Sequence, residues 1–104
     1  MAVIVVFSTF PNAEVAATVA RTLVDERLCA CVNLVPAVRS IYRWQGSVAD
    51  EPEVLAMIKT TDERRAALQA RLVELHPYDV PEALAIPIAG GHADYLAWVA
   101  AQTR

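Results

Sequence analysis

The first segment of the chain, Val3-Ile4-Val5-Val6-Phe7, is apolar at every position. Successive side chains of a β-strand point to opposite faces of a sheet, so a strand of this composition is buried on both faces. We therefore predict that this segment is a central strand. Helices of the same chain can cover one face of the sheet, and the other face then requires a second cover.

The rest of the chain predicts an alternation of strands and helices, judged from the period of its apolar residues. Strands are expected over residues 29–34, 38–44, 53–60 and 83–88, and helices after Asn12, after Thr60 and over residues 94–102. Pro36 interrupts one strand and predicts a bulge there. The turn at residues 45–47 joins its neighbouring strands into a long hairpin.

Particular residues mark the ends and the buried faces of the helices. Asn12 is a helix-capping residue, and Thr60 with Glu63 has the pattern of a capping box. The pair His76-Pro77 ends the second helix, because proline disfavours helical backbone in the residue before it. The buried side of the last helix is expected to carry Tyr95, Trp98 and Val99.

The order β-α-β-β-α-β followed by a helix predicts a ferredoxin-like α+β sandwich, with residues 1–104 as a single domain. Hydrophobic residues make up 56% of the chain. A domain of this length buries only about two-thirds of its unfolded surface, so apolar surface remains for a partner. A copy of the same chain is the simplest partner, and a homo-oligomer is expected.

Charge and segment lengths exclude two classes of partner. The net charge is −3 and the nine basic residues are scattered, which does not favour nucleic-acid binding. The apolar run from Ala2 to Phe7 is too short for a signal peptide or a membrane span, so a cytoplasmic protein is expected. In that reducing compartment Cys29 and Cys31 are expected to be free thiols, side by side on one strand.

No pattern in the sequence indicates catalysis. Ser8, Ser40 and Ser47 lie in no nucleophile elbow and in no lysine motif. A glycine-rich loop that could cradle a phosphate is also missing from the sequence. A binding protein without enzymatic activity is therefore expected.

A set of motifs across almost the whole chain resembles the CutA family of divalent-cation tolerance proteins. In chain order these are Ala30-Cys31-Val32-Asn33, Ser40-Ile41-Tyr42-Arg43-Trp44-Gln45-Gly46, Lys59-Thr60, His76-Pro77-Tyr78-Asp79-Val80-Pro81-Glu82, and Tyr95 with Trp98. The resemblance implies ferredoxin-like subunits that interlock as homotrimers through long hairpins, similar to the PII signalling trimers. It also implies a role in tolerance to divalent cations, above all copper. Cys29 and the sequence Gly90-Gly91-His92 depart from the family pattern.

Two groups of residues are candidate metal ligands, although no cofactor is expected to be required. His76, Asp79 and Glu82 are spaced by three, and His76 is expected to be the leading ligand of copper(II) or another divalent cation, with the carboxylate of Asp79 or Glu82 assisting. The alternative is that His76 caps the helix end and Asp79 anchors the turn. Cys31, and less so Cys29, offers a thiolate to copper(I), or else is a small apolar strand residue.

A third group combines aromatic and polar side chains. In the family these regions approach the cleft between subunits, which implies a ligand pocket there, with subunit packing as the alternative. Two functions remain open: a trimeric protein that binds copper or another divalent cation, and a PII-like trimer that senses a metabolite in this cleft. The candidate residues are Tyr42, Arg43, Trp44, Glu53, Lys59 and Tyr78.

Overall fold

The strand β1 (Val3–Phe10) lies inside a four-stranded sheet, between β3 (Ser47–Thr61) and β4 (Leu84–Pro87). The strand β2 (Cys31–Trp44) pairs with the other side of β3, and every pair is antiparallel. The computed structural model describes residues 2–104. The sheet order β2-β3-β1-β4 confirms the ferredoxin-like α+β fold class and the central position of the apolar first strand.

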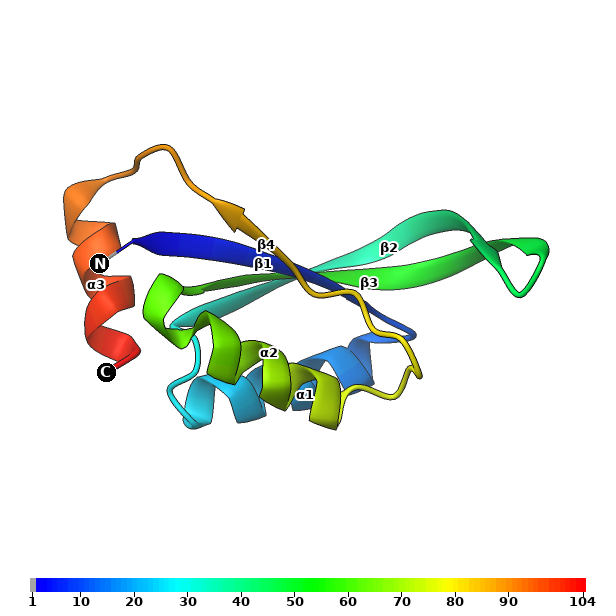
Figure 1. The fold of residues 1–104 in the computed structure, drawn as a ribbon, viewed down its shortest axis with the longest axis horizontal. Helices are drawn as coiled ribbons and strands as arrows, with labels where there is room; N and C mark the ends of the chain where they lie inside the picture. Colours follow the sequence, from blue (N-terminus) through cyan, green and yellow to red (C-terminus); the bar gives the residue numbers. More distant parts are fainter. Residues whose placement is uncertain (1) are drawn as a thin grey trace.

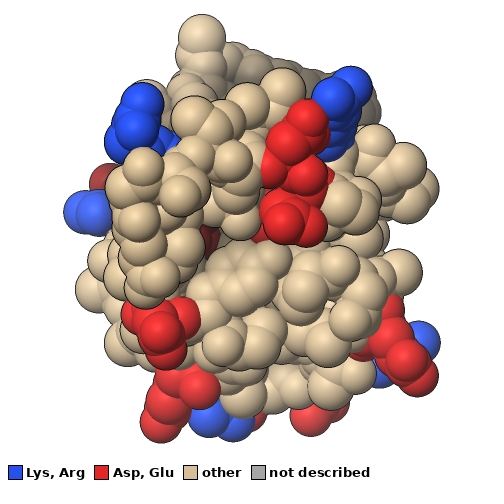
Figure 2. All heavy atoms as spheres, turned by 90° about the vertical axis from the view of Figure 1, so that its right-hand side faces the viewer, with Lys and Arg blue, Asp and Glu red and all other residues tan. Residues whose placement is uncertain are grey.

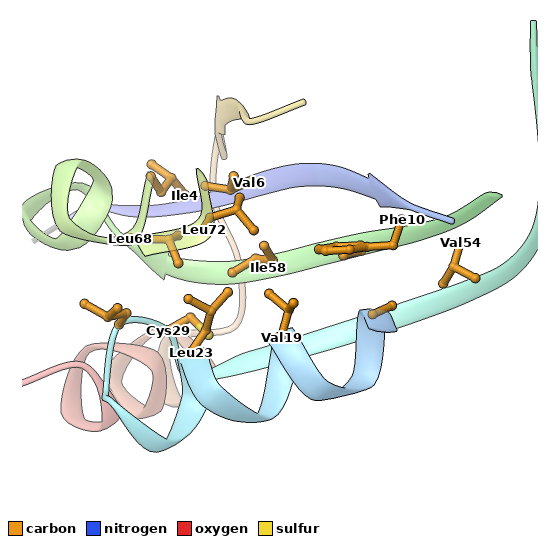
Figure 3. Packing of buried hydrophobic residues seen from close by; sticks show 13 residues of the cluster. Ile4, Val6, Phe10, Val19, Leu23, Cys29, Val54, Ile58, Leu68 and Leu72 are labelled. Carbon is orange, nitrogen blue, oxygen red and sulfur yellow. The ribbon is translucent and has the colours of Figure 1, made fainter. Parts of the chain in front are cut away.

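Two helices cover one face of the sheet. The helices α1 (Ala13–Asp25) and α2 (Arg65–Leu75) lie against each other on that face, while α3 (Ala93–Gln102) lies at the end where β1 begins (Figure 1). Between the sheet and the helices is the main hydrophobic core, shown in Figure 3. None of the helices within residues 2–104 combines the length and the apolar content that crossing a membrane requires.

The start of α1 confirms the expected cap, whereas the start of α2 corrects an expectation. The side chain of Asn12 accepts a hydrogen bond of 2.9 Å from the amide of Val15. The predicted capping box of Thr60 with Glu63 does not form, because pairing of β3 with β1 continues to Thr61. The Thr60 hydroxyl instead donates to the Leu28 carbonyl at 2.7 Å, and a 3₁₀ turn, Asp62–Arg64, precedes α2.

The sequence predicted that the two cysteines lie side by side on one strand, and this prediction is wrong. Cys29 precedes β2 and is buried in the main core, where burial raises the pKa of its thiol to about 12. Cys31 is half-buried and packs against a second, smaller core beside α3. Both are free thiols. Because β2 begins only at Cys31, the alternation of strand side chains does not apply to the pair.

The last helix also presents its aromatic residues differently from the prediction. Val99 is fully buried against Val3 and Ala30. Tyr95 and Trp98 remain 41% and 42% exposed and lie against each other with ring centroids 5.7 Å apart. The helix sits at the end of the sheet, so nothing within residues 2–104 fully covers its aromatic side.

The sheet face opposite α1 and α2 is apolar, and no helix within residues 2–104 covers it. Phe7 lies at its centre, directly beside Met57 of β3 and Leu84 of β4. Leu84 and Ile86 are 57% and 41% exposed. We refer to this surface, formed by Phe7, Leu55, Met57, Leu84 and Ile86, as the open sheet face.

The hairpin of β2 and β3 extends beyond the rest of the molecule as an arm, defined here as residues 36–53 (Figure 1). Pairing of β1 with β3 ends at Val54, so within the described chain residues 38–44 of β2 and 47–53 of β3 pair only with each other. The arm contributes to a length of 44 Å, against 26 and 22 Å in the other directions. It exposes Ile41, Val48 and Trp44.

The backbone at both ends of the arm is specialised. The register between β2 and β3 shifts between Val35 and Val38, which confirms the bulge expected at Pro36. Ala37 adopts a left-handed conformation there, with φ of 60°. At the tip, Gln45 and Gly46 both have positive φ, as a two-residue type I′ turn requires.

Candidate functional site: an acidic and aromatic cleft

A cleft of about 710 Å³ opens between the arm and the segment of residues 77–82. Its walls carry three aromatic and three acidic side chains, and none of the described residues that line it is Lys or Arg. Figure 2 views the molecule from the side to which the arm points and shows acidic groups in the upper middle of this face and along its lower edge, with basic groups mainly towards the edge. The six side chains are Tyr42, Trp44, Tyr78, Glu53, Asp79 and Glu82.

One wall of the cleft comes from the arm. Ser40, Tyr42 and Trp44 are two residues apart on β2, so their side chains share one face of the hairpin. Glu53 pairs with Val38 at the base of the arm and is only 8% exposed. Ile41 also lines the cleft, whereas Arg43 does not.

The opposite wall is held in place by His76, which ends α2. Its ring nitrogen Nδ1 accepts a hydrogen bond of 3.1 Å from the amide of Tyr78. Nε2 must therefore carry the proton, and it donates to the Thr9 carbonyl at 2.8 Å. The ring also stacks on Phe10, with centroids 4.4 Å apart. The imidazole thus ties residues 77–82 to the end of β1.

The carboxylates of the cleft have no cationic partner among the described residues. The Tyr78 hydroxyl donates to Oε2 of Glu53 at 2.6 Å, and burial together with this bond raises the pKa of Tyr78. Burial, and secondly the charge of Glu53, raises the pKa of Glu82. No ion pair within residues 2–104 involves Glu53, Asp79 or Glu82. The cleft is therefore suited to a positively charged ligand.

The structure brings together only some of the residues that the sequence singled out. Tyr42, Trp44, Glu53 and Tyr78 line the cleft together, and so do Asp79 and Glu82, which were expected to bind metal. Lys59 and Arg43 are not part of it.

Five of the lining residues were not among the predicted site residues, namely Thr9, Ser40, Ile41, Pro77 and Val80. Thr9 lines the cleft from the end of β1, and no sequence signal points to it. Ser40 could have been found, because the period of two that places Tyr42 and Trp44 on one face of β2 also places Ser40 there.

The four candidate metal ligands do not form one set. Cys31 lies at the opposite end of β2 from the arm, where the ammonium of Lys59 is 3.9 Å from its sulfur. His76 already uses both ring nitrogens in hydrogen bonds. Across residues 2–104, no three side chains of His, Cys, Asp or Glu gather closely enough to hold an ion.

Comparison with known proteins decides the family. The family model described as CutA1 divalent ion tolerance protein matches residues 4–102. The chain belongs to the CutA1 family. The resemblance noted from the sequence motifs is thereby confirmed.

Individual CutA1 relatives cover the chain almost completely. The divalent-cation tolerance protein CutA of Thermus thermophilus is 52% identical, over 95% of this chain and 96% of that protein. A solved structure of a divalent cation tolerance protein from Thermus thermophilus is 50% identical, with a TM-score of 0.94 over 98% of this chain and 99% of that chain. The mouse protein CutA is 46% identical over 89% of this chain. The match spans about half of the mouse protein, 52% of its length.

The double hydrogen bond of His76 predicts a loss of stability in mild acid. Burial lowers the pKa of His76, with smaller opposing effects from the Thr9 carbonyl and Glu53. The unfolded chain therefore binds this proton at a higher pH than the folded chain does. The contribution of neutral His76 to stability is complete above pH about 6.5, and it falls as the pH decreases through that value towards the lower folded pKa.

Melting temperatures measured between pH 7.5 and pH 5 test this expectation. His76→Ala should be less stable at neutral pH, because an unpaired Thr9 carbonyl or Tyr78 amide costs about 1–3 kcal/mol. The variant should also lose part of the acid dependence. His92→Ala is the matched control, since His92 is exposed at the start of α3. An unchanged pH slope in His76→Ala would contradict the prediction.

Proposed function

We propose that the chain is a homotrimeric divalent-cation tolerance protein of the cytoplasm that acts by binding rather than by catalysis. Membership of the CutA1 family supports the role in divalent-cation tolerance. The observation that carries the trimer is a pair of apolar surfaces that remain uncovered by the part of the chain that the structure describes, namely the open sheet face and the arm. The free thiols of Cys29 and Cys31 are consistent with a reducing compartment.

Three copies arranged around an axis would cover both surfaces. The open sheet face supplies a broad apolar area, and the arm reaches far enough to lie across a neighbour. The sheet also leaves two edge strands, β2 and β4, whose outer backbone groups have no strand partner in the described chain. Obligate interfaces of this kind resemble a hydrophobic core divided between chains.

Native mass spectrometry of protein purified without chelators tests the assembly and any bound metal together. The expected species has three times the 11.3 kDa mass of one chain. Sedimentation at micromolar concentration provides a second measurement, and it should show a trimer without a stable folded monomer. A monodisperse monomer in sedimentation would contradict the proposal.

Copper binding is the part of the proposed function that concerns the cleft. We propose that Asp79 and Glu82 bind copper(II) or another divalent cation weakly, since both line the cleft near the buried Glu53. Copper(II) should bind more tightly than zinc or nickel, because it heads the affinity order of the divalent ions. His76 can contribute only by giving up one of its two hydrogen bonds. Cys31 is the corresponding candidate for copper(I).

Titration calorimetry on the parent and three variants tests the copper proposal. Glu82→Gln should weaken copper(II) binding, because the amide lacks the negative charge of the carboxylate. His76→Ala should change the affinity less than Glu82→Gln does, because the imidazole is already hydrogen-bonded. Cys31→Ser should affect only copper(I), measured under reducing conditions. Equal copper(II) affinity in the parent and in Glu82→Gln would exclude Glu82 as a ligand.

A further inference from the structure

Lys59 is the only lysine of the chain, and it lies beside the open sheet face. It follows Met57 by two positions on β3, so both side chains point to the same side of the sheet. Its neighbours on the adjacent strands are Val5 and Cys31, and its ammonium is 3.9 Å from the sulfur of Cys31. The half-buried Lys59 takes part in no ion pair within residues 2–104. It is therefore a cation without a carboxylate partner, next to an apolar surface.

The proposed trimer makes this unpaired charge costly. A neighbouring copy that covers the open sheet face would also remove water from the Lys59 ammonium. A buried ammonium without a partner is much less favourable than one that faces a carboxylate. The neighbouring copy must therefore supply a negative group at this position, and the element that reaches far enough to lie across a neighbour is the arm.

One acidic side chain of the arm is both exposed and unpaired within the described residues. The arm has three acidic residues, Asp50, Glu51 and Glu53. Asp50 uses both carboxylate oxygens to bind Arg39, at 2.8 and 2.7 Å. Glu53 is buried and accepts a hydrogen bond from the Tyr78 hydroxyl. Glu51 is exposed and takes part in no ion pair of the described chain, so it is the carboxylate of the arm that a neighbour can use.

We propose that Glu51 of a neighbouring copy pairs with Lys59, so that each of the three interfaces of the trimer contains one such ion pair. The contact is heterologous, because a threefold axis repeats it from each copy to the next. The pair would fix where the arm lies on its neighbour, since a shifted arm would leave both charges unpaired in the interface. The inference rests on the proposed trimer and adds to it the residue pair that selects the position of the arm.

Zero-length crosslinking tests the pair directly, because a carbodiimide joins an amine to a carboxylate only where the two are in contact. Treatment of the trimer should form covalent dimers and trimers, and mass spectrometry of their peptides should identify an amide between Lys59 and Glu51. The amide forms with loss of water, which the carbodiimide takes up as a urea. No other lysine side chain can give this product. A trimer in which Lys59 couples to another carboxylate, or to none, would overturn the inference.

Two conservative variants and a matched control verify the crosslink. Lys59→Arg keeps the positive charge and should keep the trimer, but should give at least about tenfold less product, because its guanidinium stays protonated and forms no amide. Glu51→Gln should also lose the product, since a carbodiimide does not activate a carboxamide. Glu63→Gln, at an exposed acidic residue of the 3₁₀ turn, should give the yield of the parent. An unchanged yield in Glu51→Gln would contradict the proposal.

Charge reversal measures what the pair contributes to assembly. Lys59→Glu and Glu51→Lys each bring two like charges together, and sedimentation should show the concentration at half dissociation rise at least about 30-fold. The double variant Lys59→Glu/Glu51→Lys restores opposite charges and should return to within about tenfold of the parent. Lys59→Glu/Glu63→Lys has the same net charge and should remain as weak as Lys59→Glu. A first double variant no more stable than Lys59→Glu would overturn the inference.

The result for the parent protein separates this inference from the trimer proposal. A parent that sediments as a monomer would overturn the proposed trimer and this inference with it. A trimeric parent that lacks the product between Lys59 and Glu51 would overturn the inference alone.

Discussion

Phe7→Asp is expected to abolish assembly of the chain. Phe7 lies at the centre of the open sheet face, beside Met57 and Leu84. In the trimer that we propose, a neighbouring copy covers this face, so the new carboxylate would be buried without a partner. An unpaired buried charge costs about 3–5 kcal/mol, and symmetry applies this cost in every subunit. Sedimentation should show loss of the trimer at micromolar concentration.

Phe7→Leu is the control for this prediction. It keeps an apolar side chain on the open sheet face and should retain the trimer with only a modest loss of stability. A third variant, Val73→Asp, places a charge at an exposed position of α2, on the side of the molecule away from the open sheet face. It should remain trimeric. A trimeric Phe7→Asp protein would show that the open sheet face is not the interface.

Trp44→Ala should lower stability by several kcal/mol per trimer and promote dissociation. Trp44 stands at the end of β2, next to the tip of the arm, and is half-exposed in the single chain. If neighbours enclose the arm, this ring becomes a buried interface residue, and truncation of a buried Trp typically costs about 3–5 kcal/mol. Thermal unfolding and sedimentation should report the two losses together.

The comparison with Val73→Ala separates an interface effect from a general one. Val73 is 48% exposed on α2, close to the exposure of Trp44, but it lies on the helical layer. Its truncation should change the melting temperature little and leave the trimer intact. If Trp44→Ala melts like the parent and remains trimeric, the arm is not the interlocking element. The trimer would then depend on the open sheet face.

The architecture could be predicted because its determinants are local. The continuous apolar run before Ser8 identified a central strand, and the helical period after Asn12 identified α1. Asn12 caps its helix through a hydrogen bond to a residue only three positions away. The bulge followed from Pro36, which cannot donate a hydrogen bond to a neighbouring strand. Each of these signals depends on residues that are close together in the sequence.

The errors arose where distant pairing outweighed a local signal. Thr60 has the sequence context of a cap, but β3 keeps pairing with β1 and directs its hydroxyl to Leu28. Tyr95 and Trp98 are apolar enough to predict burial, but α3 reaches only the end of the sheet. In both cases the outcome depends on the position of another part of the chain. The spacing of apolar residues within a segment does not reveal that position.

The cleft was predictable in its composition but not in its hydrogen bonds. The bond from Tyr78 to Glu53 joins residues 25 positions apart, and the bond from His76 to the Thr9 carbonyl joins residues 67 positions apart. A histidine at the end of a helix is compatible with a metal ligand and with a structural role. Only the positions of Thr9 and of the Tyr78 amide show that both ring nitrogens are occupied.

The length of the arm has a consequence for subunit exchange. Within the described chain, residues 38–44 of β2 pair only with β3, the other strand of the same hairpin. In an interlocked trimer, one subunit could leave only after its arm had been withdrawn from its neighbours and theirs had released it. Dissociation of one subunit would therefore require breaking several interfaces at once. This makes dissociation slow, whatever the equilibrium between trimer and separate subunits. Two populations synthesised separately and then mixed should keep their original subunits, so each trimer would preserve a record of where and when its chains were made.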